Sequence, residues 1–176
     1  MVQAYERAKK EMIARYLQTR QAILEAADAL PVEAHNTAFV GEWTIKELLA
    51  HLSGWDYTYL DAFQEILRGE LPDFFSHYDH NWQSYNNRMV SQYRQSDLPA
   101  AIAGVRESQA RLVAFLEELP SEKVFDDCGI CTENGFHVTI SGLMESIIME
   151  EKEHLEQVQA LAASLTQQPE EGYAAP

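Results

Sequence analysis

The sequence predicts an all-helical fold, a four-helix bundle with one short helix inserted between the second and third long helices. Apolar side chains recur at helical spacing over several long stretches, and most of the 8 Gly and 6 Pro residues lie between these stretches. No alternating polar and apolar run is longer than a few residues, so no strand is expected. A length of 176 residues suits one domain with a single core. We therefore expect one bundle domain over residues 1–166 and a polar tail over residues 167–176.

The first two long helices have clear boundaries in the sequence. Apolar side chains spaced by three, four and seven residues predict the first helix over residues 3–30, and Pro31 ends it. The second helix is expected to begin at Thr44, because Thr44 and Glu47 have the spacing of a capping box. Its apolar stripe continues to Gly69, which suits the residue just after a helix end.

The later helices differ in the strength of their patterns. A stretch rich in Asn, Gln and Ser gives a weak prediction of the inserted helix over residues 79–94. The third bundle helix should start near residues 96–99, whose composition Ser-Asp-Leu-Pro is typical of a helix start, and end before Pro120. The last helix is predicted over residues 139–166, ending before Pro169.

The charge balance excludes several classes of partner. The chain has 28 acidic and 13 basic side chains, and its formal net charge is −15. General nucleic-acid binding and docking on anionic membranes both need a basic surface, so neither is expected. No apolar run approaches the roughly 18 residues of a membrane span, and the first residues lack the apolar centre of a signal peptide. Two cysteines form no disulfide framework, so a cytoplasmic protein is expected.

Three polar side chains stand where the helical stripes predict apolar ones. His154 falls within the apolar stripe of the last helix and Glu150 at its edge, one turn apart on the same face. His51 flanks the stripe of the second helix, so a bundle can bring it opposite His154. Two imidazoles and a carboxylate suit a divalent metal with open coordination positions. The simpler interpretation is a core histidine paired with a polar neighbour and an acidic helix face in water.

The pattern resembles the DinB/YfiT-like superfamily over about residues 1–166. Gly41–Asp56 is similar to the family's G-W-T opening of the second helix, which leads into an L-L-x-H-L segment. Asn81–Asn86 and the leucine-rich stretch ending at Leu116–Pro120 resemble the ClbS/DfsB branch. Glu150–His154 resembles the H-x-x-x-H segment that this branch has on its last helix.

This resemblance implies an antiparallel bundle in up-down-down-up order that is often a homodimer. In metal-binding members, three residues of the second and last helices hold Zn²⁺, Ni²⁺ or a similar ion, and by position these are His51, Glu150 and His154. The sequence departs from the family pattern at Glu150, where histidine is common. Glutamate is an acceptable ligand for Zn²⁺ and also for Mn²⁺, but the change is equally consistent with a metal site that has been lost.

The resemblance also implies a range of activities on small molecules. Related bundles include thiol transferases in which a metal holds a low-molecular-weight thiol as nucleophile. The ClbS branch includes a self-protection protein that hydrolyses a strained electrophilic toxin, and it has members without a metal requirement. We expect a metal-dependent hydrolase or thiol transferase. The alternatives are a metal-independent protective protein and a non-catalytic bundle that binds a ligand or dimerises.

Further residues are candidates for the chemistry around such a metal. Asp56 or Glu151 is a candidate general base, by proximity to His51 and His154 along the chain. Five residues are candidates for the wall of a substrate pocket: Trp43, Trp55, Tyr59, Trp82 and Asn86. Each aromatic residue among them, taken singly, is also explained by ordinary core packing.

A second cysteine–histidine pattern offers another interpretation. Cys128 and Cys131 have the spacing of a redox C-x-x-C, but the surrounding sequence lacks the strand–helix–strand context of a thioredoxin-like site. Together with His77 and His80 they have the residue types of a Cys₂His₂ zinc site, although the order is reversed from that of a zinc finger. The simpler interpretation is two loop thiols and two surface histidines.

Overall fold

The computed structural model describes residues 2–166, apart from the side chains of residues 77–80, and this range is helical without strands. The predicted all-helical class is therefore confirmed, while the predicted tail over residues 167–176 lies outside the described residues. The elements in chain order are α1 (Val2–Asp28), the 3-10 helix η1 (Val32–Asn36), α2 (Ile45–Leu67), α3 (Phe74–Tyr93), α4 (Leu98–Glu118), α5 (Ser121–Phe125) and α6 (Ile140–Thr166).

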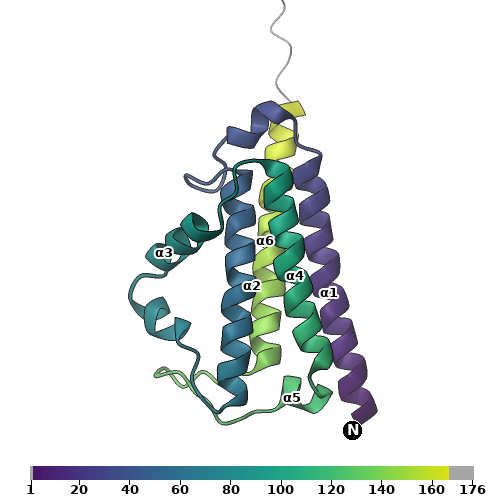
Figure 1. Cartoon of the computed structure of the whole chain (residues 1–176), viewed down its shortest axis with the longest axis vertical. Helices are drawn as coiled ribbons and strands as arrows, with labels where there is room; N and C mark the ends of the chain where they lie inside the picture. The colour runs from purple at the N-terminus through teal and green to yellow at the C-terminus, as the bar shows by residue number, and fades with distance from the viewer. Residues whose placement is uncertain (1, 167–176) are drawn as a thin grey trace, which may run out of the picture.

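Four long helices, α1, α2, α4 and α6, lie side by side along the long axis of the molecule (Figure 1). In that view α1 and α6 run upward, whereas α2 and α4 run downward. α2 packs on α4, α1 packs on α6, and α3 lies outside the four helices against α2. No helix within residues 2–166 is both long enough and apolar enough to cross a membrane.

Helix boundaries follow from side chains that satisfy the free backbone N–H groups. Thr44 precedes α2 and accepts a hydrogen bond from the backbone of Lys46, while Glu47 accepts one from the backbone N–H of Thr44 at 3.0 Å. The predicted capping box is thus confirmed. At the start of α4, Asp97 accepts a hydrogen bond from the backbone N–H of Ala100 at 2.9 Å.

The inserted helix is longer than predicted, and the prediction of a short helix over residues 79–94 was wrong in this respect. α3 begins at Phe74 and is interrupted at Asn81, whose φ of −168° and ψ of 73° are not helical. The Asn81 side chain accepts a hydrogen bond from the backbone N–H of Ser84 at 3.0 Å, so it caps the second half of α3. Sequence periodicity also missed η1 and α5, because helices of five residues are too short to show a repeat.

One buried polar network joins all four long helices. Arg20 of α1 donates to both carboxylate oxygens of Asp56 on α2, at 2.9 and 3.0 Å, and its Nε donates to Glu151 of α6 at 3.1 Å. Tyr16 of α1 and Ser108 of α4 each donate a hydroxyl hydrogen bond of 2.6 Å to Asp56. The exposed fractions of Arg20, Asp56 and Glu151 are 1%, 0% and 2%. The charged groups are paired inside the core, between apolar clusters on either side of them.

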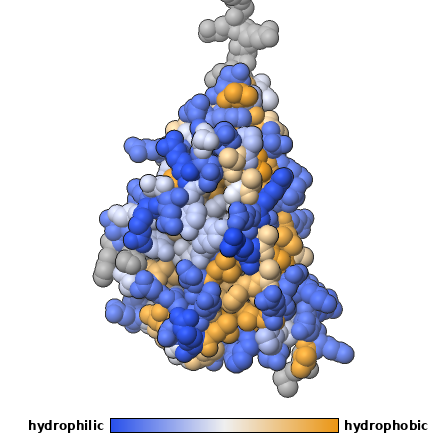
Figure 2. All heavy atoms as spheres, viewed as in Figure 1, coloured by the Kyte–Doolittle hydropathy of each residue, from blue (hydrophilic) through white to orange (hydrophobic). Residues whose placement is uncertain are grey.

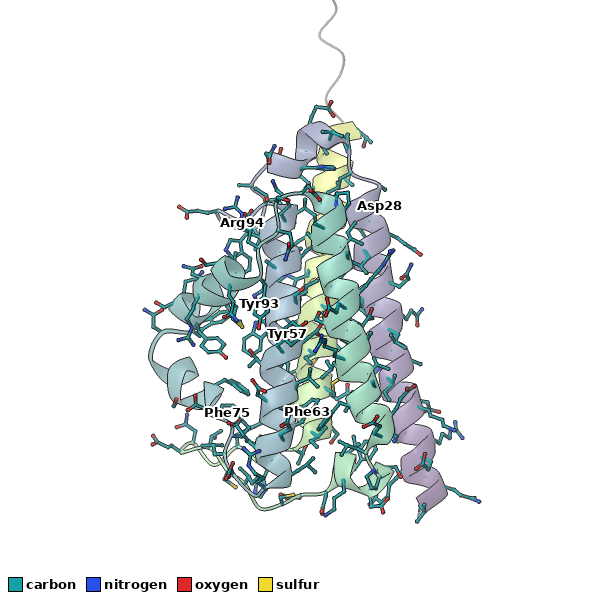
Figure 3. All side chains as sticks on the ribbon, in the orientation of Figure 1. Asp28, Tyr57, Phe63, Phe75, Tyr93 and Arg94 are labelled. Carbon is teal, nitrogen blue, oxygen red and sulfur yellow. The ribbon has the colours of Figure 1, made fainter. Side chains whose placement is uncertain are left out.

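α3 is attached to α2 by close backbone approach and by ring stacking. Gly54 of α2 lies so near α3 that an added Cβ would be 2.8 Å from the Cβ of Met89. Tyr57 and Tyr93 stack with ring centroids 5.1 Å apart between the two helices (Figure 3). The face in Figure 2 is mostly hydrophilic, and hydrophobic residues gather in its lower half over α2 and α4.

Candidate metal centre

His51 of α2 and the pair Glu150 and His154 of α6 converge between the two helices. One ligand atom of each residue lies within 4.8 Å of the other two. His51 Nε2 is 3.3 Å and His154 Nε2 is 3.7 Å from the same oxygen, Glu150 Oε1. The two imidazole rings are nearly perpendicular, with centroids 5.2 Å apart. The predicted opposition of His51 and His154 is therefore observed, and Glu150 lies between them.

The neighbours of the two histidines orient their rings. His154 Nδ1 is 2.8 Å from Gln157 Oε1, and because the amide oxygen only accepts, Nδ1 is the donor and Nε2 keeps a free lone pair. Buried His154 Nε2 has no hydrogen-bond partner, which is unusual for a buried polar atom and is the state that a metal ligand needs. The Trp43 ring packs against His51, with centroids 4.9 Å apart and planes tilted by 44°. A turn that needs the positive φ of Gly41, 59°, places Trp43 there.

The electrostatics of the triad favour one carboxylate and at least one neutral imidazole. Burial opposes ionisation of Glu150, but polar contacts with His154 and His51 outweigh it and lower its pKa to about 2. Burial lowers the pKa of His51 more than Glu150 raises it, so His51 is neutral near pH 7. His154 is also buried, yet contacts with Glu150 and Gln157 raise its pKa above the ordinary value. A proton and a metal ion therefore compete for His154.

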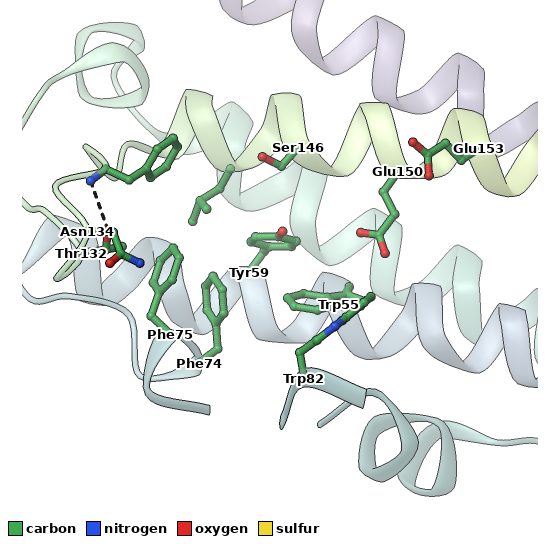
Figure 4. A pocket seen from close by; sticks show the side chains of 12 residues that line it. Trp55, Tyr59, Phe74, Phe75, Trp82, Thr132, Asn134, Ser146, Glu150 and Glu153 are labelled. Atoms are coloured by element: carbon green, nitrogen blue, oxygen red, sulfur yellow. Dashed lines mark hydrogen bonds between the residues drawn. The ribbon is translucent and has the colours of Figure 1, made fainter. Parts of the chain in front are cut away.

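Two adjoining cavities reach this triad. The first, of about 530 Å³, lies between α2, the start of α3, the loop before α6, and α6 itself. The second, of about 580 Å³, is bounded by the turn before α2, the second half of α3, and α6. Glu150, Glu153 and Trp82 line both cavities, and Figure 4 shows the carboxylate of Glu150 pointing into the first cavity toward Trp55 and Trp82. An ion held by the triad would face both cavities.

A comparison with models of known protein families identifies the family of the chain. A family model described as the DinB superfamily matches residues 15–158, which is most of the chain and includes all three triad residues. The chain belongs to the DinB superfamily. Members of the DinB superfamily often bind metal, in agreement with the His51, Glu150 and His154 group. No curated protein and no solved structure gave a significant match to this chain.

All five predicted pocket residues of this DinB superfamily member line one of the two cavities. Trp55 and Tyr59 line the first, Trp43 and Asn86 line the second, and Trp82 lines both. Asn86 Oδ1 accepts a hydrogen bond of 3.2 Å from the Trp55 indole. This bond links a residue that lines the first cavity to one that lines the second. That these residues contact a substrate stays a prediction.

The two candidate bases occupy a different environment in this DinB bundle. Asp56 and Glu151 belong to the buried network around Arg20, and neither lines either of the two cavities. Burial raises the pKa of Glu151 in spite of the adjacent guanidinium, and Glu151 Oε2 has no hydrogen-bond partner. A role for either residue as general base stays a prediction, and their contacts indicate a structural role.

Sequence reasoning missed several residues of the site. Gln157, three residues after His154, is on the same helix face, and that spacing could have indicated it as the partner of the histidine. Phe74 and Phe75, at the start of α3, and Phe136, in the loop before α6, form much of the first cavity. Phe74 and Phe75 lie in the first turn of α3 and Phe136 lies in a loop, so the period of the apolar side chains could not place them in the cavity wall.

The cysteine pair lies in the loop before α6, away from the triad residues in sequence. Cys128 and Cys131 are exposed free thiols. Nearby His137 pairs with Asp127 at 2.9 Å rather than with a thiol. The predicted alternative zinc site also needs His77 and His80, whose side chains lie outside the described residues. Among the described side chains, the group with metal-binding geometry is the triad on α2 and α6.

Proposed function

We propose that this DinB superfamily member binds one divalent metal ion through His51, Glu150 and His154 and acts on a small molecule held in the adjoining cavities. The observation that carries the proposal is the convergence of three ligand atoms within 4.8 Å, together with a buried His154 Nε2 that has no other partner. Isolated histidines in a core normally satisfy both ring nitrogens, so a free Nε2 directed at a second imidazole and a carboxylate favours metal binding over simple packing.

The donor set fits a catalytic metal better than a structural one. Two imidazoles and one carboxylate are three protein ligands, which leaves a coordination position open to the cavities. The ligand types suit Zn²⁺ or Ni²⁺, and the carboxylate also admits Mn²⁺. When bound, such an ion supplies Lewis-acid polarisation of a substrate or a nucleophile. Hydrolysis and transfer of a low-molecular-weight thiol are the reaction classes that we propose.

The chain's own residues prepare the site for this role. Gln157 fixes the His154 tautomer through Nδ1, which keeps Nε2 available. Trp43 packs against His51 at 4.9 Å and Trp55 lies nearly perpendicular to it at 6.2 Å between centroids, and His51 is buried from water. Glu150 remains a carboxylate over the whole physiological range, because its pKa is about 2.

The experiment is a plasma-emission assay of metal in purified protein and in matched variants. We expect about one equivalent of metal in the parent chain. His51→Ala and His154→Ala should lose it, whereas His137→Ala, which removes an exposed histidine paired with Asp127, should keep it. Circular dichroism of each variant checks the helix content. Unchanged metal in a folded His154→Ala variant, or no uptake by the parent chain from added Zn²⁺, Ni²⁺ or Mn²⁺, would contradict the proposal.

One observation supports a second candidate function. The first cavity has an aromatic wall that needs no metal to form, so it also suits a ClbS-like protein that binds and opens an electrophile without a metal. That function predicts that His51→Ala and His154→Ala variants still protect a deletion strain from an electrophilic compound. Loss of protection together with loss of metal would instead favour the metal-dependent activity. The homodimer implied by the resemblance remains a prediction for light scattering.

A further inference from the structure

The wall of the first cavity is mostly apolar and aromatic. Trp55 and Tyr59 of α2 lie 5.2 Å apart between centroids, and Phe74 meets both rings nearly edge-on at 5.7 and 5.8 Å. Phe75, stacked on Phe74, and Leu143 of α6 extend this wall. A volume of about 530 Å³ is enough for a ring-sized hydrophobic group, and the aromatic faces provide its contact area.

The charged side chains that line the first cavity are all acidic. Glu150 and Glu153 lie at one end of the first cavity, opposite the end formed by Phe75 and Asn134 (Figure 4). Neither cavity has a Lys or Arg among its described lining residues, and the sequence has neither residue at positions 77–80 or 167–176. An anionic ligand in the first cavity would therefore meet two carboxylates and no basic side chain of the lining.

We propose that the first cavity selects amphiphilic amines, with a hydrophobic ring-containing body on the aromatic wall and a protonated amine facing Glu153. This inference rests on the proposed function, because it takes the cavity to be the substrate site. A metal ion at the triad would engage Glu150, which leaves Glu153 as the carboxylate for the amine. Trp55 and Trp82, near the acidic end in Figure 4, add the aromatic faces on which cations bind well.

The test compares three ligands that have one hydrophobic body and different head groups: phenylbutylamine, phenylbutanol and phenylbutyrate. Binding to the protein as purified is measured by isothermal calorimetry at neutral pH and low ionic strength. An exposed carboxylate and a cation–π contact together should make the amine bind about threefold to tenfold more tightly than the alcohol. In protein treated with a chelator, where no metal ion attracts an anion, the carboxylate should bind more weakly than the alcohol, and added salt should reduce both differences.

Matched variants assign the selectivity to one residue. Glu153→Gln should remove the part of the amine's advantage over the alcohol that comes from the carboxylate, leave the part that comes from the cation–π contact, and leave alcohol affinity unchanged. Glu156→Gln changes the net charge equally at an exposed position of α6 outside both cavities, and it should preserve the selectivity. Phe136→Ala should weaken all three ligands to a similar degree, since Phe136 contributes only wall area.

The outcomes separate this inference from the proposed metal function. Equal affinity for the three ligands, no binding of any of them, tighter binding of the carboxylate, or the same loss of selectivity in Glu153→Gln and Glu156→Gln would overturn the amine proposal. Metal content is measured in the same samples. A metal-free protein that cannot be loaded but still prefers the amine would support the amine proposal while the metal function fails.

Discussion

The substitution Asp56→Ala tests whether the buried network is a main source of stability. The Asp56 carboxylate is 0% exposed and accepts four hydrogen bonds, two from Arg20 and one each from Tyr16 and Ser108. Removal of the carboxylate leaves the Arg20 guanidinium buried with Glu151 as its remaining carboxylate partner. The Tyr16 hydroxyl loses the hydrogen bond that the structure gives it, whereas Ser108 keeps a bond to the carbonyl of Val105.

The expected cost follows from the burial of this charge pair. Removing one partner of a buried ion pair costs about 3–5 kcal/mol, because the other charge stays buried with less compensation. The whole free energy of unfolding of a domain is about 5–15 kcal/mol, so the variant loses a large part of its stability. For a domain of this size, that corresponds to a fall in Tm of about 6–20 °C.

Urea unfolding followed by circular dichroism measures the change in free energy of unfolding. The matched control is Glu145→Ala, which removes a carboxylate from the Arg15 pair on the surface, where the side chains are 47% and 46% exposed. That exposed pair should be worth about 0–1 kcal/mol. A cost for Asp56→Ala as small as that of Glu145→Ala would refute the structural role of the network.

Two further predictions concern pH and glycine. A protonated imidazole cannot bind a metal, so a fall in pH through the raised pKa of His154 should weaken metal affinity by up to about tenfold per unit, while His51, with its lowered pKa, stays neutral. Chelator competition at several pH values measures this, and a constant affinity would contradict it. Gly54→Ala should cost about 1–3 kcal/mol because its Cβ would meet Met89 at 2.8 Å. Gly104→Ala, whose Cβ would have its nearest neighbour, the Ser53 hydroxyl oxygen, 4.0 Å away, should instead stabilise α4 by about 0.5–1 kcal/mol. Unfolding midpoints that show no difference between the two variants would contradict the close packing of α3 on α2.

The sequence predicts much of this structure where local rules suffice. The long helices follow from the period of their apolar side chains, and the capping box at Thr44 follows from one spacing rule. The grouping of His51, Glu150 and His154 could also be predicted from the sequence, because Glu150 and His154 are one turn apart and His51 interrupts an apolar helix. The buried network could be predicted only in part. Arg20 lies in the apolar stripe of α1, which marks it as unusual, but its partners Asp56 and Glu151 are 36 and 131 residues away in the sequence. The break at Asn81 has no periodic signal, and its one local mark is a side chain that can cap the helix that follows.

The buried network also affects the distance between the candidate metal ligands. Asp56 follows His51 by five residues on α2, and Glu151 precedes His154 by three on α6, so Arg20 joins the segments of these two helices that carry the candidate ligands. A slide of α6 along α2 by one helical turn, about 5.4 Å, would separate the guanidinium from a carboxylate before it moved the imidazoles into a new alignment. The network therefore fixes the axial register of the two helices, and with it the spacing of His51, Glu150 and His154, through side chains outside this triad.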